Sequence, residues 1–365
     1  MLIGIDASRA NKNKKTGVEW YSYHLIEQFK KIDKKNRFFL YTNEPLKGDL
    51  AKCPLNFEEK VLNWPLSRFW TMGRLTWEML LAKEKPDLLF VPSHTLPLAK
   101  PDKAVVTIHD IGFEHFPDFY HWADKSYHKL AIKIIKRKAD KIITVSQYSK
   151  KDISNVYNLD MEKIKVVYNG YDKETYHLIK DFEPKIKEPY ILFIGRLELK
   201  KNIPRLVKAF ARLKQQNPQL KHKLVLIGSK GLTFNLVEKQ IKKYQLDEQI
   251  IFPGWVKDEE LPVWLNGADL FAFPSIFEGF GIPVLEAMAC GCPVVCSDST
   301  SLPEAAGRAT LMFDPRNVEQ MTEQMKKVLT DAYIKAELVK KGLERVKNFS
   351  WKKCADQTLE VLENT

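Results

Sequence analysis

Residues 275–296 read Ser275-Ile-Phe-Glu-Gly-Phe-Gly-Ile-Pro-Val-Leu-Glu-Ala-Met-Ala-Cys-Gly-Cys-Pro-Val-Val-Cys296. An apolar run that ends at Phe273 precedes a Gly-rich loop, which indicates a buried strand and its exit. Pro283 stands where a helix begins, because its missing N–H is unneeded there, and Gly291 is placed to end that helix. A strand, a glycine-rich loop and a helix in this order are typical of an α/β domain whose loop meets a ligand.

Two carboxylates, Glu278 and Glu286, stand in this segment with seven residues between them. Loop glycines and a helix N-terminus offer backbone N–H groups to phosphate oxygens, whereas a carboxylate accepts several hydrogen bonds from sugar hydroxyls. The segment therefore favours a nucleotide-sugar, which presents both groups. Two alternatives stay open at this point: a pair of surface carboxylates, or an acid/base pair like that of a glycosidase.

The bulk composition indicates a soluble protein of two ordinary domains. The chain has 365 residues, of which 44% are hydrophobic and 28% are charged. No apolar run approaches the roughly twenty residues of a membrane helix. The start, Met1–Asp6, lacks a basic region before an apolar stretch, so we expect no signal peptide and a cytoplasmic location.

The net charge of +12 is carried mostly by lysine. It fits nucleic acid, an anionic membrane surface, phosphorylated ligands, or simply a lysine-rich solvated surface. Nucleic acid is not expected, because no zinc-finger spacing or aromatic RNA-binding signature is visible. Cys290, Cys292 and Cys296 cluster without a nearby histidine, so we interpret them as packing residues and expect no metal site.

Strand-like and helical patterns alternate along the chain, which predicts parallel βαβ units. The alternation stops in a polar stretch and restarts at Tyr190. We therefore expect a doubly wound domain over residues 1–172, a linker over 173–189, a second doubly wound domain over 190–346, and a C-terminal helix over 347–365. Ligands of such domains bind outside the carboxyl ends of the strands, here in a cleft between the domains.

Basic side chains follow the first strand of the second domain. Gly195 and Arg196 come directly after it, and Lys201 follows five residues later. Guanidinium and ammonium groups suit a pyrophosphate, and prepositioned cations stabilise a leaving nucleoside diphosphate. A solvated basic loop is the alternative. Gly228, another glycine at a strand end, adds a weaker signal for nucleotide contact.

The first half offers two further candidates. His109, paired in sequence with Asp110, ends a strand and could bind a sugar hydroxyl or relay a proton, unless Asp110 merely satisfies it. Gly17 opens the first helix, and its N–H could approach a phosphate. The first strand is not followed by a Gly-x-Gly-x-x-Gly motif, and no Walker A motif occurs, which disfavours a dehydrogenase and a P-loop enzyme.

Two regions of the first half bear on membrane contact. The basic helix expected over 126–138 carries Tyr127, Leu130 and Ile134, which we expect to pack on a sheet rather than enter a membrane. An aromatic-rich region is either core or a contact for a lipid-linked acceptor; its members are Trp64, Phe69, Trp70 and Trp77. Peripheral contact with an anionic membrane remains an expectation.

Taken together, these residues resemble the retaining glycosyltransferases of the GT-B fold, family 4. Glu278 and Glu286 match the E-x7-E motif of that family. The resemblance extends to further short segments: Gly195-Arg196, Lys201-Asn202, His109-Asp110, Asn169-Gly170 and Ser301–Gly307. It covers nearly the whole chain and is strongest from Tyr190 to Pro315.

The resemblance implies two facing Rossmann-like domains, the second holding the donor, and a final helix from Trp351 that crosses back to the first. Arg196 and Lys201 would neutralise the diphosphate, so that no metal and no other cofactor is required. Glu286 would hold the ribose and Glu278 the donor sugar, with His109 reaching the sugar from the first domain. The expected donor site also includes Gly17, Gly195, Gly228, Val256, Gly279, Phe280, Gly281 and Ile282. Many members carry a double glycine where this chain has Thr16-Gly17, so the role of Gly17 is open.

The implied reaction is hexosyl transfer with retention, and we favour mannose from GDP-mannose. The acceptor is expected to be a saccharide or a lipid-linked sugar in cell-surface polysaccharide or glycolipid synthesis. Alternatives are a UDP- or TDP-linked glucosyl, N-acetylglucosaminyl or rhamnosyl donor, an epimerase or hydrolase of the same fold, and a non-catalytic basic binding protein. Front-side attack is favoured over double displacement, in which Glu278 would be the nucleophile.

Overall fold

The computed structural model describes residues 1–65 and 69–365. The chain forms two compact units. Unit 1 comprises Met1–Gly170 together with Trp351–Thr365, and unit 2 comprises Tyr171–Ser350. The expected linker, 173–189, is grouped with unit 2 and runs as turns and irregular backbone.

Unit 1 is built on a parallel sheet whose strand order is β3-β2-β1-β4-β5-β6-β7. The strands are β1 (Leu2–Asp6), β2 (Arg37–Thr42), β3 (Phe57–Val61), β4 (Leu88–Val91), β5 (Lys103–Thr107), β6 (Lys141–Thr144) and β7 (Ile164–Val166). Strands β1 and β4 are neighbours although two strands separate them in sequence. The direction of winding therefore reverses between β1 and β4, and this is where doubly wound sheets bind ligands.

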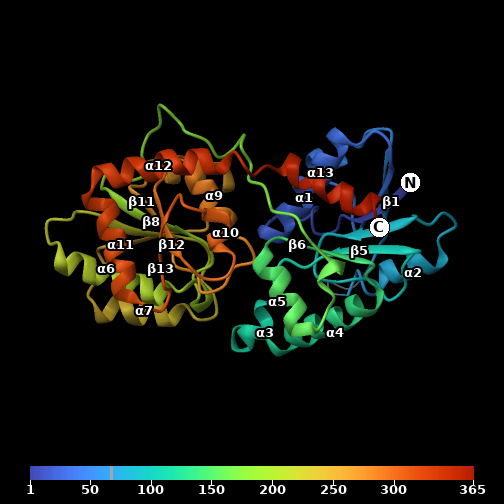
Figure 1. Ribbon diagram of the computed structural model, residues 1–365, viewed down its shortest axis with the longest axis horizontal. Helices are drawn as coiled ribbons and strands as arrows, with labels where there is room; N and C mark the ends of the chain where they lie inside the picture. The colour runs from blue at the N-terminus through green and yellow to red at the C-terminus, as the bar shows by residue number, and fades with distance from the viewer. Residues whose placement is uncertain (66–68) are drawn as a thin grey trace. The chain divides into compact units, whose positions relative to one another are not determined.

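Helices flank this sheet: α1 (Gly17–Ile32), α2 (Arg74–Leu81), α3 (Gly112–His115), α4 (Trp122–Lys138), α5 (Gln147–Tyr157) and α13 (Trp351–Glu363). The last of them, α13, lies beside α1 although the two stand at opposite ends of the chain (Figure 1). The rings of His24 and Trp351 stack with centroids 4.8 Å apart, and the amide of Asn36 donates to Glu363 at 2.9 Å. These contacts make the C-terminal helix part of unit 1.

Unit 2 repeats the arrangement with strand order β10-β9-β8-β11-β12-β13. Its strands are β8 (Tyr190–Ile194), β9 (Lys223–Ile227), β10 (Ile250–Gly254), β11 (Leu270–Phe273), β12 (Val294–Ser297) and β13 (Leu311–Phe313). Its helices are α6 (Ile203–Gln216), α7 (Phe234–Lys243), α8 (Leu261–Gly267), α9 (Ile282–Ala289), α10 (Leu302–Ala306), α11 (Val318–Thr330) and α12 (Ala332–Val346). Winding reverses here between β8 and β11, which pair in parallel.

Both sheets are buried because helices cover their faces. The central strands accordingly read as continuous apolar runs rather than alternating ones, as in the buried Leu88–Val91 and Leu270–Phe273. Helix α6 buries one stripe, including Leu206, Phe210 and Leu213, and keeps its charges outside. The predicted α/β class with two doubly wound sheets is confirmed.

Several elements differ from the sequence expectation. Strand β3 was not predicted, because it lies at the sheet edge and its charged sequence, Phe57-Glu-Glu-Lys-Val61, hides the apolar pattern. Pro283 and Gly291 predict a helix over Pro283–Cys290. Helix α9 begins at Ile282 and ends at Ala289, one residue earlier at each end. Within the described residues, no helix combines the length and apolarity needed to cross a bilayer.

The predicted packing of α4 is right for Tyr127 and Ile134 and wrong for Leu130. Ile134 is buried and Tyr127 packs against the core, but the Leu130 side chain is exposed to solvent. The aromatic-rich region also divides: Trp70 is a core residue and Trp64 packs against the core, whereas Phe69 and Trp77 are exposed.

Candidate functional site

In unit 2, two loops emerge from the neighbouring strands β8 and β11 at the point where the sheet reverses its winding. The loop after β8 carries Gly195 and Arg196, and the loop after β11 carries Glu278. Parallel strands that are neighbours end at the same edge of the sheet. The topology therefore brings these two predicted segments together, although about eighty residues separate them in sequence.

Glycines allow the strand-end loops to approach each other closely. A Cβ at Gly228 would lie 2.0 Å from the carbonyl oxygen of Gly195, so only glycine fits at position 228. Both residues have positive φ, +150° at Gly195 and +140° at Gly228. The amide of Gly195 donates to the Ile227 carbonyl at 2.9 Å, and the amide of Gly228 donates to that of Gly254 at 2.8 Å. These hydrogen bonds join the residues at the carboxyl ends of β8, β9 and β10 to one another.

Lys201 and Glu278 are in direct contact. The Lys201 Nζ donates to the Glu278 Oε1 at 2.5 Å, and both side chains are largely shielded from solvent. Lys201 closes a short 3-10 turn, η4 (Leu199–Lys201), whose Lys200 carbonyl accepts from the Ile276 amide at 3.0 Å. Lys201, which we expect to bind the diphosphate, and Glu278, which we expect to bind the donor sugar, are therefore in direct contact.

The Glu278 loop is held by the segment that follows β12. The Glu278 amide donates to Thr300 Oγ1 at 3.1 Å, and Ser301 Oγ donates to the Glu278 carbonyl at 2.8 Å. Gly281 caps α9 with φ +108°, and a Cβ there would lie 2.6 Å from Leu302 Cδ2. Phe280 is buried against Phe349, with ring centroids 5.7 Å apart. The loop that carries Gly279, Phe280 and Gly281 is therefore fixed by packing as well as by hydrogen bonds.

Glu286 lies in α9 and is only partly exposed. Burial raises the pKa of its carboxyl to about 8, and the charges of Asp258 and Asp172 add to the shift. Asp258 follows β10 in the same loop as Val256, another predicted donor residue, while Ile282 opens α9. Near neutral pH, Glu286 therefore carries a proton, which allows it both to donate and to accept a hydrogen bond.

Arg196 presents its guanidinium to solvent. Its side chain is 59% exposed, and its Nε lies 3.5 Å from Glu198 Oε2. The exposed fork can reorient toward an anion, whereas the Lys201 ammonium is already engaged by Glu278. Among the four predicted catalytic residues, the structure joins Lys201 to Glu278 and places Arg196 on the adjacent strand exit.

The fourth predicted catalytic residue, His109, lies in unit 1 just beyond β5. It is 8% exposed, its Nε2 lies 3.3 Å from the Pro92 carbonyl, and its ring meets that of Tyr21 edge-on at 4.6 Å. Burial lowers the pKa of His109 and favours a neutral ring that donates from Nε2. The Asp110 Oδ1 accepts from the Gly112 amide at 2.8 Å, and the charge of Asp110 raises the pKa of His109 against the larger effect of burial.

Gly17, also in unit 1, begins α1 behind Thr16, which forms a capping box with Glu19. A Cβ at position 17 would meet no atom within 4 Å, so packing does not require glycine there. The sequence reasoning overlooked three other side chains in this unit: Arg9, His94 and His128. Applying the rule of strand carboxyl ends to β1 and β4 identifies Arg9 and His94, each three residues past a strand.

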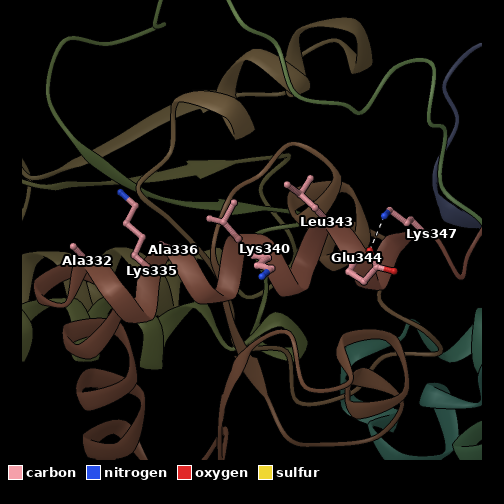
Figure 2. Close-up of a pocket in the computed structure, with 8 residues that line it drawn as sticks. Ala332, Lys335, Ala336, Lys340, Leu343, Glu344 and Lys347 are labelled. Carbon is pink, nitrogen blue, oxygen red and sulfur yellow. Dashed lines mark hydrogen bonds and ion pairs between the residues drawn. The ribbon is translucent and has the colours of Figure 1, made fainter.

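A groove with a volume of about 590 Å³ lies elsewhere in unit 2, along one face of α12. Figure 2 shows the side chains that line it, among them Lys335, Leu343 and Lys347. It contains none of the predicted donor residues. We therefore base the candidate site on the strand-end residues and not on this groove.

Comparison with known proteins identifies the family. Residues 177–345 match the family described as glycosyl transferases group 1, and residues 15–175 match glycosyltransferase family 4. The O-antigen chain mannosyltransferase B of Escherichia coli is 29% identical over 346 residues, covering 92% of this chain and 87% of that protein. The O-antigen chain mannosyltransferase RfbU of Salmonella typhimurium is 28% identical over 272 residues, covering 72% of each.

Solved structures share the fold over the full chain. Sucrose-phosphate synthase from Thermosynechococcus elongatus superposes with a TM-score of 0.78 at 20% identity, covering 100% of this chain and 98% of that one. The Anabaena protein HepE in complex with UDP-glucose gives a TM-score of 0.73 at 20% identity, with coverage of 100% and 99%. The chain is therefore a glycosyltransferase of the GT-B fold that belongs to family 4.

Proposed function

We propose that this enzyme transfers mannose from GDP-mannose to a saccharide or lipid-linked acceptor during synthesis of a cell-surface polysaccharide such as O-antigen. The names of the bacterial relatives support the sugar and the pathway. The contact between Lys201 and Glu278 carries the assignment to a nucleotide-sugar, because it places a cation for diphosphate and a carboxylate for sugar hydroxyls at one strand exit.

In this proposal Arg196 and Lys201 bind the donor diphosphate and stabilise the charge that develops on it as the glycosidic bond breaks. Glu278 orients the donor sugar, and Glu286 binds the ribose hydroxyls. The two cations supply the positive charge that a divalent metal supplies in other transferases, so transfer proceeds without a metal. The product keeps the anomeric configuration of the donor, through attack of the acceptor hydroxyl on the leaving-group side.

A donor panel tests the proposal. Purified enzyme is incubated with GDP-mannose, UDP-glucose, UDP-N-acetylglucosamine or TDP-rhamnose and a mannose-terminated oligosaccharide, with and without EDTA. We expect transfer from GDP-mannose, unchanged by EDTA, and an α-linked product by NMR. Transfer from a UDP- or TDP-sugar alone would replace the donor assignment, a β-linked mannoside would refute retention, and inhibition by EDTA would refute metal independence.

We further propose that unit 1 docks on an anionic membrane through α2. One stripe of this helix exposes three large apolar side chains, with Trp77 at 64%, Leu80 at 58% and Leu81 at 74%. The exposed Lys83 and Lys85 follow, with the exposed Glu84 between them. An apolar stripe beside lysines suits the interface of an acidic bilayer, where acyl chains and phosphates are both within reach.

Vesicle sedimentation tests this docking. We expect the enzyme to sediment with vesicles of phosphatidylcholine and phosphatidylglycerol more than with phosphatidylcholine alone, and we expect Leu81→Glu to weaken that binding at least fivefold. Leu232→Glu is the matched control, because Leu232 is a similarly exposed leucine of unit 2. Equal binding of the Leu81 and Leu232 variants would contradict the assignment to α2.

A further inference from the structure

Unit 1 carries an arginine at the same topological position as Arg196 in unit 2. Arg196 follows β8 by two residues, and Arg9 follows β1 by three. Strands β8 and β1 each border the reversal of winding in their own sheet. Each arginine also lies beside a glutamate, Glu198 for Arg196 and Glu19 for Arg9. The ligand-binding edge of the first sheet therefore has its own guanidinium, which the proposed donor site does not use.

The Arg9 guanidinium is available to a ligand. Its side chain is 43% exposed, and its Nη1 donates to Glu19 Oε1 at 3.3 Å. A guanidinium carries five N–H donors in a planar fork, so this one described hydrogen bond leaves most of the fork unused. Glu19 is itself held by the capping box with Thr16, which fixes the position from which Arg9 extends.

Three histidines lie near one another at the edge of the sheet from which Arg9 extends. His94 follows β4, His109 follows β5, and His128 comes from α4. The ring of His94 lies 5.2 Å from that of His109 and 6.1 Å from that of His128. Burial lowers the pKa of both His94 and His128, the Asp110 carboxylate opposes that shift at both rings, and the charge of Arg9 adds to it more weakly.

These imidazoles are neutral, and one of them lacks a partner. Burial lowers the pKa of all three histidines, most strongly that of His94. Among the described residues, no group hydrogen-bonds to His128 Nδ1, although that atom is buried. A buried ring nitrogen without a partner is costly unless a ligand or a water satisfies it. Because the charge of Arg9 acts on the same ring, a ligand that binds the arginine is a candidate partner for this atom.

A phosphate group matches this set of donors. The arginine fork pairs with two phosphate oxygens at once, and imidazole N–H groups can reach the remaining oxygens from another side. A carboxylate offers two oxygens in one plane, and Glu19 already fills that role at Nη1. Bringing a phosphate to His94 or His128 would also favour protonation of the ring, which adds charge to the contact.

We propose that unit 1 binds a phosphate ester of the acceptor at the carboxyl ends of β1 and β4, through Arg9 together with His94 and His128. The acceptor class is then a phosphorylated sugar, either a free sugar phosphate or a sugar on a lipid diphosphate. Arg9 positions the acceptor and takes no part in bond making. The assignment to an acceptor rests on the proposed transferase function, whereas the phosphate site itself does not.

Histidine NMR on the full chain tests the site directly. The chain has eight histidines, six in unit 1 and two in unit 2, and 15N labelling of their rings follows each of them. Inorganic phosphate is titrated at constant ionic strength. We expect saturable shifts of the His94 and His128 rings, and Arg9→Gln should weaken the apparent affinity at least tenfold. Arg9→Lys keeps the charge and the Glu19 pair but loses the fork, and it should bind with intermediate affinity.

Lys12→Gln is the matched control, because Lys12 is an exposed cation of the same loop, and it should leave the titration unchanged. Unchanged His94 and His128 signals in the wild-type chain would overturn the proposal. Equal affinity of Arg9→Gln and wild type would also overturn it. If Arg9→Gln fails to fold, Arg9→Lys and the wild-type shifts still decide, since fork loss without a loss of affinity contradicts the site.

Two further titrations distinguish the sources of the phosphate. One uses mannose 1-phosphate, and the other uses a polyprenyl diphosphate sugar in detergent. If either compound shifts the His94 and His128 signals at lower concentration than inorganic phosphate does, the site is supported and that compound identifies the class of acceptor. If neither compound shifts these signals, the assignment to an acceptor site is overturned. Failure of the proposed function is visible separately, as loss of nucleoside diphosphate binding at unit 2 while the unit 1 shifts persist.

Discussion

The raised pKa of Glu286 makes the stability of unit 2 depend on pH in a testable way. Burial raises the pKa of the carboxyl to about 8 in the folded protein, against an ordinary value of 4.5. Between these values the folded state holds a proton that the unfolded state has lost, so the free energy of unfolding falls as the pH rises. Replacing Glu286 by Gln keeps the shape and removes the titration.

The size of the effect follows from the shift, at 1.36 kcal/mol per pKa unit. Glu286→Gln should stabilise the fold by up to about 0.8 kcal/mol at pH 5 and up to about 3 kcal/mol at pH 7, and the gain levels off above pH 8. These values are upper limits because the side chain is partly exposed and solvent reduces the penalty of its charge.

Urea unfolding of both proteins at pH 5, 6, 7 and 8 measures this difference. Glu259→Gln is the matched control, because Glu259 is an exposed glutamate of the same unit. We expect the gain from Glu286→Gln to grow with pH and the control to stay within about 0.5 kcal/mol of wild type at every pH. A gain that is the same at pH 5 and pH 8 would refute the electrostatic reasoning, and a loss at pH 8 would reverse its sign.

Three further predictions follow from unit 2. Gly228→Ala should destabilise the fold by more than about 2 kcal/mol in thermal or urea unfolding, because its Cβ would meet the Gly195 carbonyl, whereas Gly17→Ala, which meets nothing, should change it by less than about 1 kcal/mol. Asp269→Asn should cost about 1–2 kcal/mol at pH 7, because the hydrogen bond from His222 and contacts with Lys335 lower the pKa of Asp269 to about 2. That contribution is complete above about pH 5 and is lost as the pH falls toward 2, so urea unfolding at pH 7 and pH 3 measures it. Glu278→Gln should slow transfer at least a hundredfold with an unchanged circular dichroism spectrum, and mass spectrometry of wild type with donor should find no glycosyl adduct on Glu278; an adduct would favour double displacement.

The sequence predicted those strands and helices whose apolar pattern depends on burial alone. The central strands are apolar throughout because both faces of the sheet are covered, so an apolar run such as Leu270–Phe273 is recognisable as a buried strand. Strand β3 was not predictable in this way, since an edge strand buries only part of its surface and keeps its charges. Helix ends marked by Pro283 and Gly291 were predicted to within one residue, because their effect on the backbone is local.

The candidate site was predictable as a set of loops and not as a set of contacts. Each strand exit is visible in the local sequence, which is how Gly195, Arg196 and Glu278 were found. The contact between Lys201 and Glu278 spans 77 residues and depends on which strands are neighbours. The histidine cluster depends in the same way on the placement of α4 over the strand exits of β4 and β5, which no local pattern reveals.

The two carboxyl groups of the segment 275–296 differ in their electrostatic surroundings, and this difference constrains their use. Glu278 faces the Lys201 ammonium, which holds it as a hydrogen-bond acceptor. Glu286 faces Asp172 and Asp258 and retains its proton near pH 7. A nucleotide-sugar brings a diphosphate, and a second ionised carboxylate near that charge would repel it. A protonated Glu286 avoids that repulsion. It can donate a hydrogen bond to one ribose hydroxyl and accept a hydrogen bond from the adjacent one. The raised pKa is therefore consistent with a ribose-binding role for Glu286.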